Sequence, residues 1–251
     1  MISNKSIIRH TPNVITLFNL VAGCLSIVSA FEGNLQMAGI LIIVAAIFDF
    51  FDGFTARLLG AYSPLGKELD SLSDVVSFGI APSMILFQLL KGALGIPNSE
   101  GLLSGHYLLA VPFIMAAFSS LRLGIFNLDE RQTSSFIGLP TPANALLTVG
   151  LVFGLNSSWS NIFSIIDSSA VAIIVLVLVQ SALLVCEIPM FSLKLKSLKF
   201  SVAYKQITLI IGAIVLVVIF QTAALSLAIL WYISLSIFFW FIEKKSKVIG
   251  N

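Results

Sequence analysis

The sequence predicts an all-α protein that crosses a membrane several times as a bundle of about eight helices. Its composition, its apolar runs and the placement of its basic residues support this class. Apolar residues make up 58% of 251 positions, charged residues only 10%, and the mean hydropathy is +1.04. Average soluble domains are about 45–50% apolar and about 25% charged. This excludes soluble globular, disordered and nucleic-acid-binding proteins and makes the lipid bilayer the expected surroundings.

Eight apolar runs are candidates for membrane-spanning helices. A bilayer core about 30 Å thick requires roughly 20 apolar residues in a helix. The first run begins after Thr11-Pro12, where a capping residue followed by proline predicts a helix start. The fifth run is short, and the last two, nearly continuous around Gln221-Thr222, predict a hairpin or a less regular segment. The runs lie near residues 13–31, 36–57, 72–94, 106–127, 142–157, 169–187, 207–222 and 224–242.

Lysine and arginine residues predict the orientation in the membrane, because they gather on the cytoplasmic side. If the N-terminus is cytoplasmic, thirteen of the fourteen basic residues fall inside and only Lys91 falls outside. We therefore expect an even number of spans with both termini in the cytoplasm. A polar stretch near residues 192–205 predicts a six-helix core over residues 1–195. Residues 196–251 would form a terminal helix pair with a basic tail.

Four of the six aspartates fall within 26 residues, at the predicted cytoplasmic ends of the second and third runs: Asp49, Asp52, Asp70 and Asp74. Charged side chains at membrane depth cost about 3 kcal/mol or more each, so they normally face a polar cavity. The spacings i, i+3 and i, i+4 place each pair on one helical face. Gly60 and Ser63-Pro64 predict a break that brings the two pairs together.

Four converging carboxylates repel one another unless cations lie between them. Hard oxygen ligands at this density suit Mg²⁺ or Mn²⁺, and four are enough for two ions. The alternative is a solvated acidic loop or an ion-pair network with Arg57, Lys67 and Arg122. Gly53 and Ala56 favour a ligand site because they leave space above the carboxylates. Arg57 is placed to pair with a phosphate.

The acidic segment reads Asp49-x2-Asp52-Gly53-x2-Ala56-Arg57-x8-Gly66-x3-Asp70-x3-Asp74. It resembles the signature of the CDP-alcohol phosphotransferase family, D-x2-D-G-x2-A-R-x8-G-x3-D-x3-D, at all eight fixed positions. At residue frequencies of about 5–8%, a chance match has a probability on the order of 10⁻⁹ per start position. Four flanking segments resemble one branch of this family, the bacterial integral-membrane phosphatidylserine synthases: residues 12–20, 71–82, 136–145 and 188–191. One departure is Ile125, where that branch usually has a basic residue.

The resemblance implies transfer of a phosphatidyl group from CDP-diacylglycerol to the hydroxyl of L-serine, with release of CMP. It implies two divalent cations, Mg²⁺ or Mn²⁺, bound by Asp49, Asp52, Asp70 and Asp74, with Asp74 also acting as the general base. The donor would be bound by Asn13, Val14, Ile15, Thr16, Gly53, Ala56, Arg57, Ser63 and Gly66. The acceptor or lipid phosphate would be bound by Lys67, Arg122 and Arg131. A homodimer in the bacterial cytoplasmic (inner) membrane is implied, with the active site on the cytoplasmic side.

Three other functions are each compatible with part of this pattern. The same chemistry with glycerol 3-phosphate or an inositol phosphate as acceptor would require several convergent basic residues, and Ile125 removes one. An intramembrane prenyltransferase also uses aspartates and Mg²⁺, but the chain has no N-D-x-x-D pattern. A cation transporter more often places its acids near the bilayer midplane on several helices. The clustering at one end therefore favours phosphatidyl transfer to serine.

Overall fold

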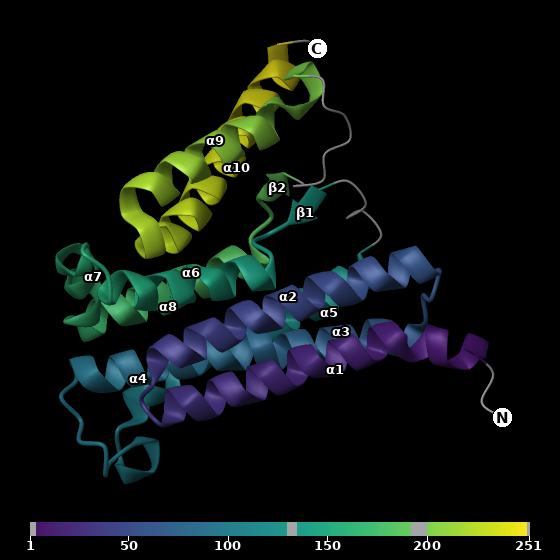
Figure 1. The fold of residues 1–251 in the computed structure, drawn as a ribbon. Coiled ribbons are helices and arrows are strands. Elements are labelled where there is room, and N and C mark those ends of the chain that lie inside the picture. Colours follow the sequence, from purple (N-terminus) through teal and green to yellow (C-terminus); the bar gives the residue numbers. More distant parts are fainter. Residues whose placement is uncertain (1–3, 130–134, 192–199, 250–251) are drawn as a thin grey trace.

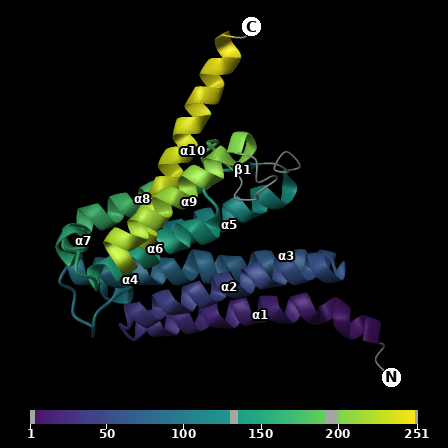
Figure 2. The ribbon, with the colours of Figure 1, turned by 45° about the horizontal axis from the view of Figure 1, so that its top comes forward.

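The computed structural model describes residues 4–129, 135–191 and 200–249, and this part of the chain is almost entirely helical (Figure 1). A first layer contains three long rods that run side by side in both views (Figures 1 and 2). They are α1 (Asn4–Phe31), α2 (Leu35–Leu59), and a third rod made of α3 (Pro64–Asp74), a π-helix η1 (Val75–Ile80) and α4 (Ala81–Ala93). This layer carries all four aspartates of the acidic segment.

The rest of the described chain covers this layer. It contains η2 (Leu102–Ser104), η3 (Tyr107–Ala110), α5 (Phe113–Leu128), α6 (Thr141–Leu155), α7 (Ser160–Asp167), α8 (Ala170–Val185), α9 (Phe200–Phe220), η4 (Gln221–Ala223) and α10 (Ala224–Ile249). Two short strands, β1 (Ser135–Ile137) and β2 (Pro189–Phe191), pair antiparallel with Phe136 opposite Met190. The main apolar core lies between the two parts of the bundle and includes the fully buried Phe78, Ile85 and Leu86.

Five helical segments are long and apolar enough to cross a membrane, which supports an all-α membrane bundle: His10–Phe31, Leu35–Leu59, Pro64–Ala93, Tyr107–Leu128 and Tyr204–Ile242. A sixth results if α6 and α7, bent by 118° relative to each other, form one span, and α8 is a shorter apolar helix. Each of the eight predicted runs contains a helix. The predicted number of eight spans and the orientation of the termini remain predictions.

The predicted break between the second and third runs is confirmed. α2 ends at Leu59, and Gly60 follows in the left-handed conformation with φ of 58°. Gly60 donates its backbone N–H to the last carbonyls of α2, which is the usual role of glycine at a helix end. Ser63 then caps α3 by accepting the N–H of Gly66 at 3.0 Å, and Pro64 occupies the first turn. This short turn places Asp70 and Asp74 beside α2.

The start of the first helix differs from the prediction. α1 begins at Asn4, so Pro12 lies inside the helix and does not open it. Proline prefers a helix start because it lacks an N–H, but a longer helix tolerates the loss of one backbone bond. The hydroxyl of Thr16 donates to the carbonyl of Pro12 at 3.1 Å in this turn. Pro12 is therefore held within α1, where it lines the cavity described below.

The last two helices pack against α6 and against each other. Gly150 on α6 touches the backbone of Ser226 on α10, where any added side chain would collide. The hydroxyl of Tyr232 on α10 donates to the carbonyl of Phe191 at 3.0 Å, which ties α10 to β2. The predicted boundary between residues 195 and 196 lies outside the described residues. The helix pair forms an additional layer on the side of α6, away from α1 (Figure 1).

Candidate metal centre and substrate cavity

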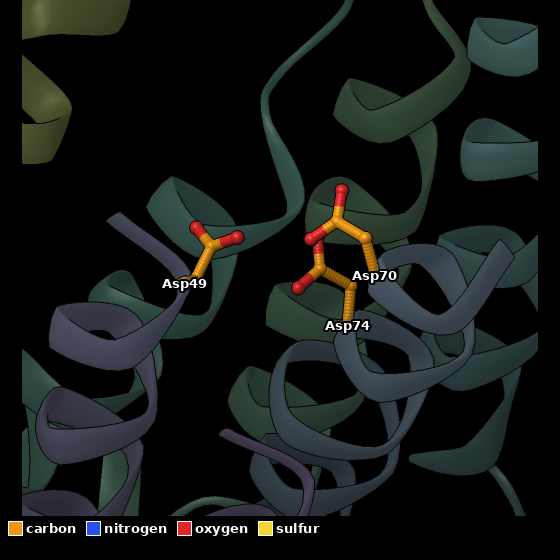
Figure 3. A group of neighbouring side chains, drawn as sticks. All are labelled: Asp49, Asp70 and Asp74. Carbon is orange, nitrogen blue, oxygen red and sulfur yellow. The ribbon is translucent and has the colours of Figure 1, made fainter. Parts of the chain in front are cut away.

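Three carboxylates from two helices converge at one place in the first layer (Figure 3). Asp49 lies on α2, and Asp70 and Asp74 lie one turn apart on α3. One oxygen of each carboxylate lies within 4.8 Å of the others. Like charges at this distance repel strongly in a partly buried site, and a divalent cation with oxygen ligands relieves that repulsion.

Asp52 lies one turn after Asp49 on α2, within electrostatic reach of the other three carboxylates. It is only 6% exposed, and Thr16 of α1 lies beside it. Oδ2 of Asp52 and Oδ1 of Asp70 are buried and have no hydrogen-bond partner in the described part of the chain. Hard oxygen atoms without partners are a donor set that fits Mg²⁺ or Mn²⁺. The four residues that the sequence predicts as ligands thus lie in one region.

The alternative of a structural ion-pair network has no support among the residues that the structure describes. The ion pair recorded there joins His106 and Glu100 at 2.8 Å, and none involves the four aspartates. Arg122 interacts electrostatically with Asp74 without forming an ion pair. The carboxylates are therefore not neutralised by basic side chains of these described residues.

Asn19 is a site residue that sequence reasoning missed. Its side-chain N–H donates to Oδ1 of Asp74 at 3.2 Å, and its backbone carbonyl accepts the hydroxyl of Ser77 at 3.0 Å. Asn19 is fully buried, and Asp74 is 7% exposed. A signal was present in the sequence, because Asn19 lies three residues after Thr16 and so on the same face of α1. The contact holds the carboxylate of Asp74 in one orientation.

A cavity of about 610 Å³ opens next to the carboxylates, between α1, α2 and the start of α3. This volume lies within the range of small-molecule and cofactor sites, about 300–1,000 Å³. The residues that line it are Pro12, Asn13, Thr16, Asp52, Gly53, Ala56, Ala61, Tyr62, Ser63, Pro64, Gly66, Lys67 and Asp70. Six of the nine positions predicted to bind the donor are among them.

The other three predicted donor-binding positions do not line the cavity. Val14 is 49% exposed, and Ile15 is only partly buried. Arg57 is exposed, but its guanidinium lies across Gly53, with one nitrogen 3.7 Å from the position of an added Cβ. Arg57 is therefore close to the cavity, whereas Val14 is half exposed and does not line it.

Gly66 allows α1 and α3 to approach each other at the cavity. A Cβ at this position would lie 3.0 Å from Oδ1 of Asn13 and 3.1 Å from Oγ of Ser63, closer than ordinary contact. Gly53 has a different environment: apart from the backbone of its own helix, the one described contact of an added Cβ would be the Arg57 side chain. Gly66 thus permits the close packing of α1 against α3, and Gly53 leaves space in the cavity.

The predicted acceptor-binding residues have different environments. Lys67 lines the cavity, but its ammonium group donates to the backbone carbonyl of Asn127 at 2.9 Å. The amide of Asn127 in turn donates to Oγ of Ser71 at 2.7 Å, so α3 is linked to the end of α5. Arg131 lies outside the described residues. Ile125, the position of the departure, is 45% exposed on α5.

Arg122 is the buried basic residue on the side of Asp74. It is 7% exposed, and its guanidinium carbon lies 5.3 Å from the ring centre of Phe126. Its Nε has no hydrogen-bond partner among the described residues. A buried guanidinium N–H without a hydrogen-bond acceptor is disfavoured, and an anion bound there would supply the acceptor. Arg122 therefore suits a ligand carboxylate or phosphate.

A second group of unpartnered polar atoms, also missed by sequence reasoning, lies at the start of α6. Thr141 and Asn144 are fully buried, and neither the hydroxyl of Thr141 nor either side-chain atom of Asn144 has a partner in the described part. One turn further, the hydroxyl of Thr148 donates to Gln180 at 3.2 Å. Buried polar groups without partners are rare in proteins, which indicates water or a ligand at this position.

Comparisons with known proteins match the same region of the chain. A family profile described as CDP-alcohol phosphatidyltransferase matches residues 9–179. The CDP-diacylglycerol–serine O-phosphatidyltransferase of Bacillus subtilis is 34% identical over 148 residues, which are 59% of this chain and 78% of that protein. The enzyme of the same name from Methanocaldococcus jannaschii is 36% identical over 159 residues, 62% of this chain and 67% of that protein. The archaetidylserine synthase of Methanothermobacter thermautotrophicus is 33% identical over 137 residues, 54% of both chains.

Proposed function

Because the chain belongs to the CDP-alcohol phosphatidyltransferase family, whose profile matches residues 9–179, we propose that it transfers the phosphatidyl group of CDP-diacylglycerol to the hydroxyl of L-serine. The products are phosphatidylserine and CMP. The observation that carries the proposal is the convergence of aspartates beside a 610 Å³ cavity, in a chain similar to enzymes named for this reaction. Family membership also argues against a prenyltransferase or a cation transporter.

The cavity between α1, α2 and α3 is the proposed binding site of the CDP moiety. Asn13 and Thr16 offer polar groups from α1, and Gly53 and Ala56 leave the space that a nucleotide requires. Arg57, which lies across Gly53, supplies a positive charge for the pyrophosphate. The acyl chains of the donor would remain in the bilayer, because the outer surface of α2 is apolar, with Phe50 62% exposed.

Asp49, Asp52, Asp70 and Asp74 are the proposed ligands of two divalent cations, Mg²⁺ or Mn²⁺. When bound, such ions neutralise the pyrophosphate and stabilise the attacking and leaving oxygens of a phosphoryl-type transfer. We propose that Asp74 takes the proton of the serine hydroxyl as the hydroxyl oxygen attacks phosphorus and CMP departs. Asn19 supports this role because it orients the carboxylate through Oδ1 and leaves the other oxygen for the acceptor.

The acceptor is proposed to bind with its carboxylate on Arg122. This residue is buried, has an unpartnered nitrogen and interacts electrostatically with Asp74. Lys67 is the weaker candidate because its ammonium group already contacts Asn127. One buried guanidinium matches one carboxylate, whereas glycerol 3-phosphate or an inositol phosphate needs several basic groups around a doubly charged phosphate. This comparison favours serine over the alternative acceptors.

The direct test supplies membranes containing the protein with CDP-diacylglycerol and labelled serine or labelled glycerol 3-phosphate, with Mg²⁺, with Mn²⁺ and with a chelator. We expect serine to enter lipid with one CMP released per lipid formed, only when metal is present. Incorporation of glycerol 3-phosphate but not serine would contradict serine as the acceptor and support glycerol 3-phosphate in its place. No incorporation of either with metal present would contradict the proposed activity.

We further propose that the protein is a homodimer in the inner membrane of a bacterium, with both termini and the active site on the cytoplasmic side. Residues 1–195 are the proposed six-helix catalytic core, and residues 196–251 are an added helix pair with a basic tail. The family profile ends at residue 179, within α8, so α9 and α10 lie beyond the matched region. The apolar helices of the core are consistent with these membrane positions.

A further inference from the structure

A second cavity, of about 450 Å³, lies at the opposite end of the first layer from the aspartates. It is bounded by the turn between α1 and α2, the end of α4 and the segment leading into η2, and it shares no lining residue with the first cavity. Thr16 and Phe31 line different cavities on the same helix and are separated by roughly 22 Å at 1.5 Å per residue. The two cavities are therefore separate sites.

Lys91 lines this second cavity and is the exception in the charge pattern of the sequence. It is the one basic residue predicted to lie away from the cytoplasm. Its side chain is only 8% exposed, and its ammonium group donates to the carbonyl of Asn98 at 3.3 Å. Among the residues that the structure describes, it forms no ion pair. A buried ammonium group with one neutral hydrogen bond strongly favours an anion in the adjoining space.

The other charges around the cavity are acidic. Glu32 is exposed in the turn after α1, and Glu100 is paired with His106 at 2.8 Å. A purely anionic ligand would be attracted by Lys91 and repelled by Glu32. A ligand with one phosphate and one amine instead matches both, because each of its charges has an opposite charge on the wall of the cavity.

The rim of the cavity is apolar and open to its surroundings. Phe31 is 72% exposed and Leu103 is fully exposed, and both line the cavity. Tyr107, just beyond on η3, is 79% exposed. In a membrane protein, exposed apolar side chains around a polar pocket are suited to hydrocarbon chains, and tyrosine is enriched at the level of the lipid headgroups.

We propose that this cavity binds a zwitterionic phospholipid from the leaflet opposite the aspartate site. Its phosphate contacts the ammonium group of Lys91, its amine faces Glu32, and its acyl chains lie along Phe31 and Leu103. The site is a lipid-binding site and takes no part in the transfer reaction. It explains why a lysine is buried at the end of the bundle where, among the described residues, the charge pattern predicts no other lysine or arginine.

The test uses native mass spectrometry of the full chain purified in detergent, with dioleoyl phosphatidylethanolamine, dioleoyl phosphatidylglycerol or dioleoylglycerol added. For one bound molecule per chain, we expect retention of phosphatidylethanolamine to exceed that of dioleoylglycerol by about tenfold, as a charge-assisted hydrogen bond provides. Lys91→Met should lose this difference in retention, and Lys91→Arg should keep it. Glu32→Gln should retain phosphatidylethanolamine and phosphatidylglycerol equally.

Lys244→Met is the matched control, because Lys244 is an exposed lysine near the end of α10, and this variant should retain lipid as the unmodified chain does. Serine transfer should be unchanged in Lys91→Met, which also demonstrates that this variant folds. Equal retention of phosphatidylethanolamine by Lys91→Met and the unmodified chain would overturn the proposal. Displacement of the lipid by equimolar soluble glycerophosphoethanolamine would overturn it too, because the ligand would then be a free headgroup and not a lipid.

Discussion

Asp74 is held by a neutral amide and lies near a buried guanidinium, which distinguishes its surroundings from those of the other three carboxylates. We predict that Asp74→Asn lowers the rate of CMP release at least 100-fold, because general-base catalysis contributes about 10²–10⁴-fold. The amide has nearly the same shape and can still accept from Asn19. The variant should therefore insert and melt like the unmodified chain. Normal turnover in a folded Asp74→Asn protein would refute the assignment of the base.

Asn19 is proposed as a positioning residue. We predict that Asn19→Ala lowers kcat about tenfold or more and changes the KM for CDP-diacylglycerol little, because one hydrogen bond to a charged group is lost and the cavity is not altered. Ser26→Ala is the control: Ser26 lies on the same helix, is fully buried and also loses one hydrogen bond, to the carbonyl of Ala38 at 2.8 Å. A fall in kcat of equal size in both variants would indicate a general packing effect.

Gly66 offers a steric test of the cavity. In Gly66→Ala, the new methyl group would push against Asn13 and Ser63, so we predict a several-fold higher KM for CDP-diacylglycerol in steady-state assays. Gly124→Ala is the matched control, because a Cβ at that position on α5 would meet no described residue within 4 Å beyond its chain neighbours and the backbone of its own helix. If Gly66→Ala leaves KM unchanged, the approach of α1 to α3 does not shape the donor site.

Helical geometry explains which site residues the sequence could predict. The four aspartates follow from their spacing, and the structure places them together. Asn13, Thr16 and Asn19 repeat every three residues, so they share a face of α1, whereas Val14 is turned by about 100° from Asn13. Val14 and Ile15 were predicted to bind the donor from the family resemblance alone and not from helical spacing. The hydrogen-bond partner of Asn19 depends on how α1 packs against α3. The spacing of residues along one helix carries no information about that packing.

At the scale of elements, the turn between α2 and α3 was predictable and the π-helix after Asp74 was not. Gly60, Ser63 and Pro64 each have a local conformational preference that determines where a helix stops or starts. η1 occupies Val75–Ile80 within a run that reads as one uninterrupted apolar helix. A π-helix forms i→i+5 hydrogen bonds in place of the usual i→i+4 bonds. This change is too small to be seen in the hydrophobic periodicity of six residues.

The contact between α6 and α10 depends on Gly150. We predict that Gly150→Ala lowers the free energy of unfolding by about 1–3 kcal/mol, because the added methyl group collides with the backbone of Ser226. The melting temperature should fall accordingly. Gly92→Ala on α4 is the control, since a Cβ there meets no described residue within 4 Å beyond its chain neighbours and the backbone of its own helix. Equal melting temperatures for both variants in detergent would show that α10 is free to move away from α6.

At the scale of the whole molecule, the distribution of basic residues predicts the orientation. After replacement of Cys24 and Cys186 by serine, we expect a single cysteine at position 99, in the exposed turn after α4, to react with a membrane-impermeant maleimide in intact cells. A single cysteine at position 128 should react only after the cells are opened. Ser99 and Leu128 are both exposed, Leu128 at 86%, so access is decided by the side of the membrane. The reverse labelling pattern would invert the proposed topology.

The sequence predicted the order of the helices better than their assembly. Run lengths depend on bilayer thickness, so each predicted run contains a helix. The 118° bend between α6 and α7 and the antiparallel pairing of β1 with β2 depend on contacts between distant segments. Such contacts are set by packing in three dimensions and leave little trace in composition or period. For this reason the number of spans was harder to predict than the class of fold.

The residues that line the aspartate cavity all belong to one continuous stretch, from Pro12 to Asp70. Arg122, which we propose binds the acceptor, lies on α5, and Tyr232, which interacts electrostatically with Arg122, lies on α10. Both helices are synthesised after this stretch. During synthesis, the proposed donor half of the site is thus complete before the proposed acceptor half has entered the membrane. The same division lets mutation change the acceptor over evolutionary time while the nucleotide half stays intact.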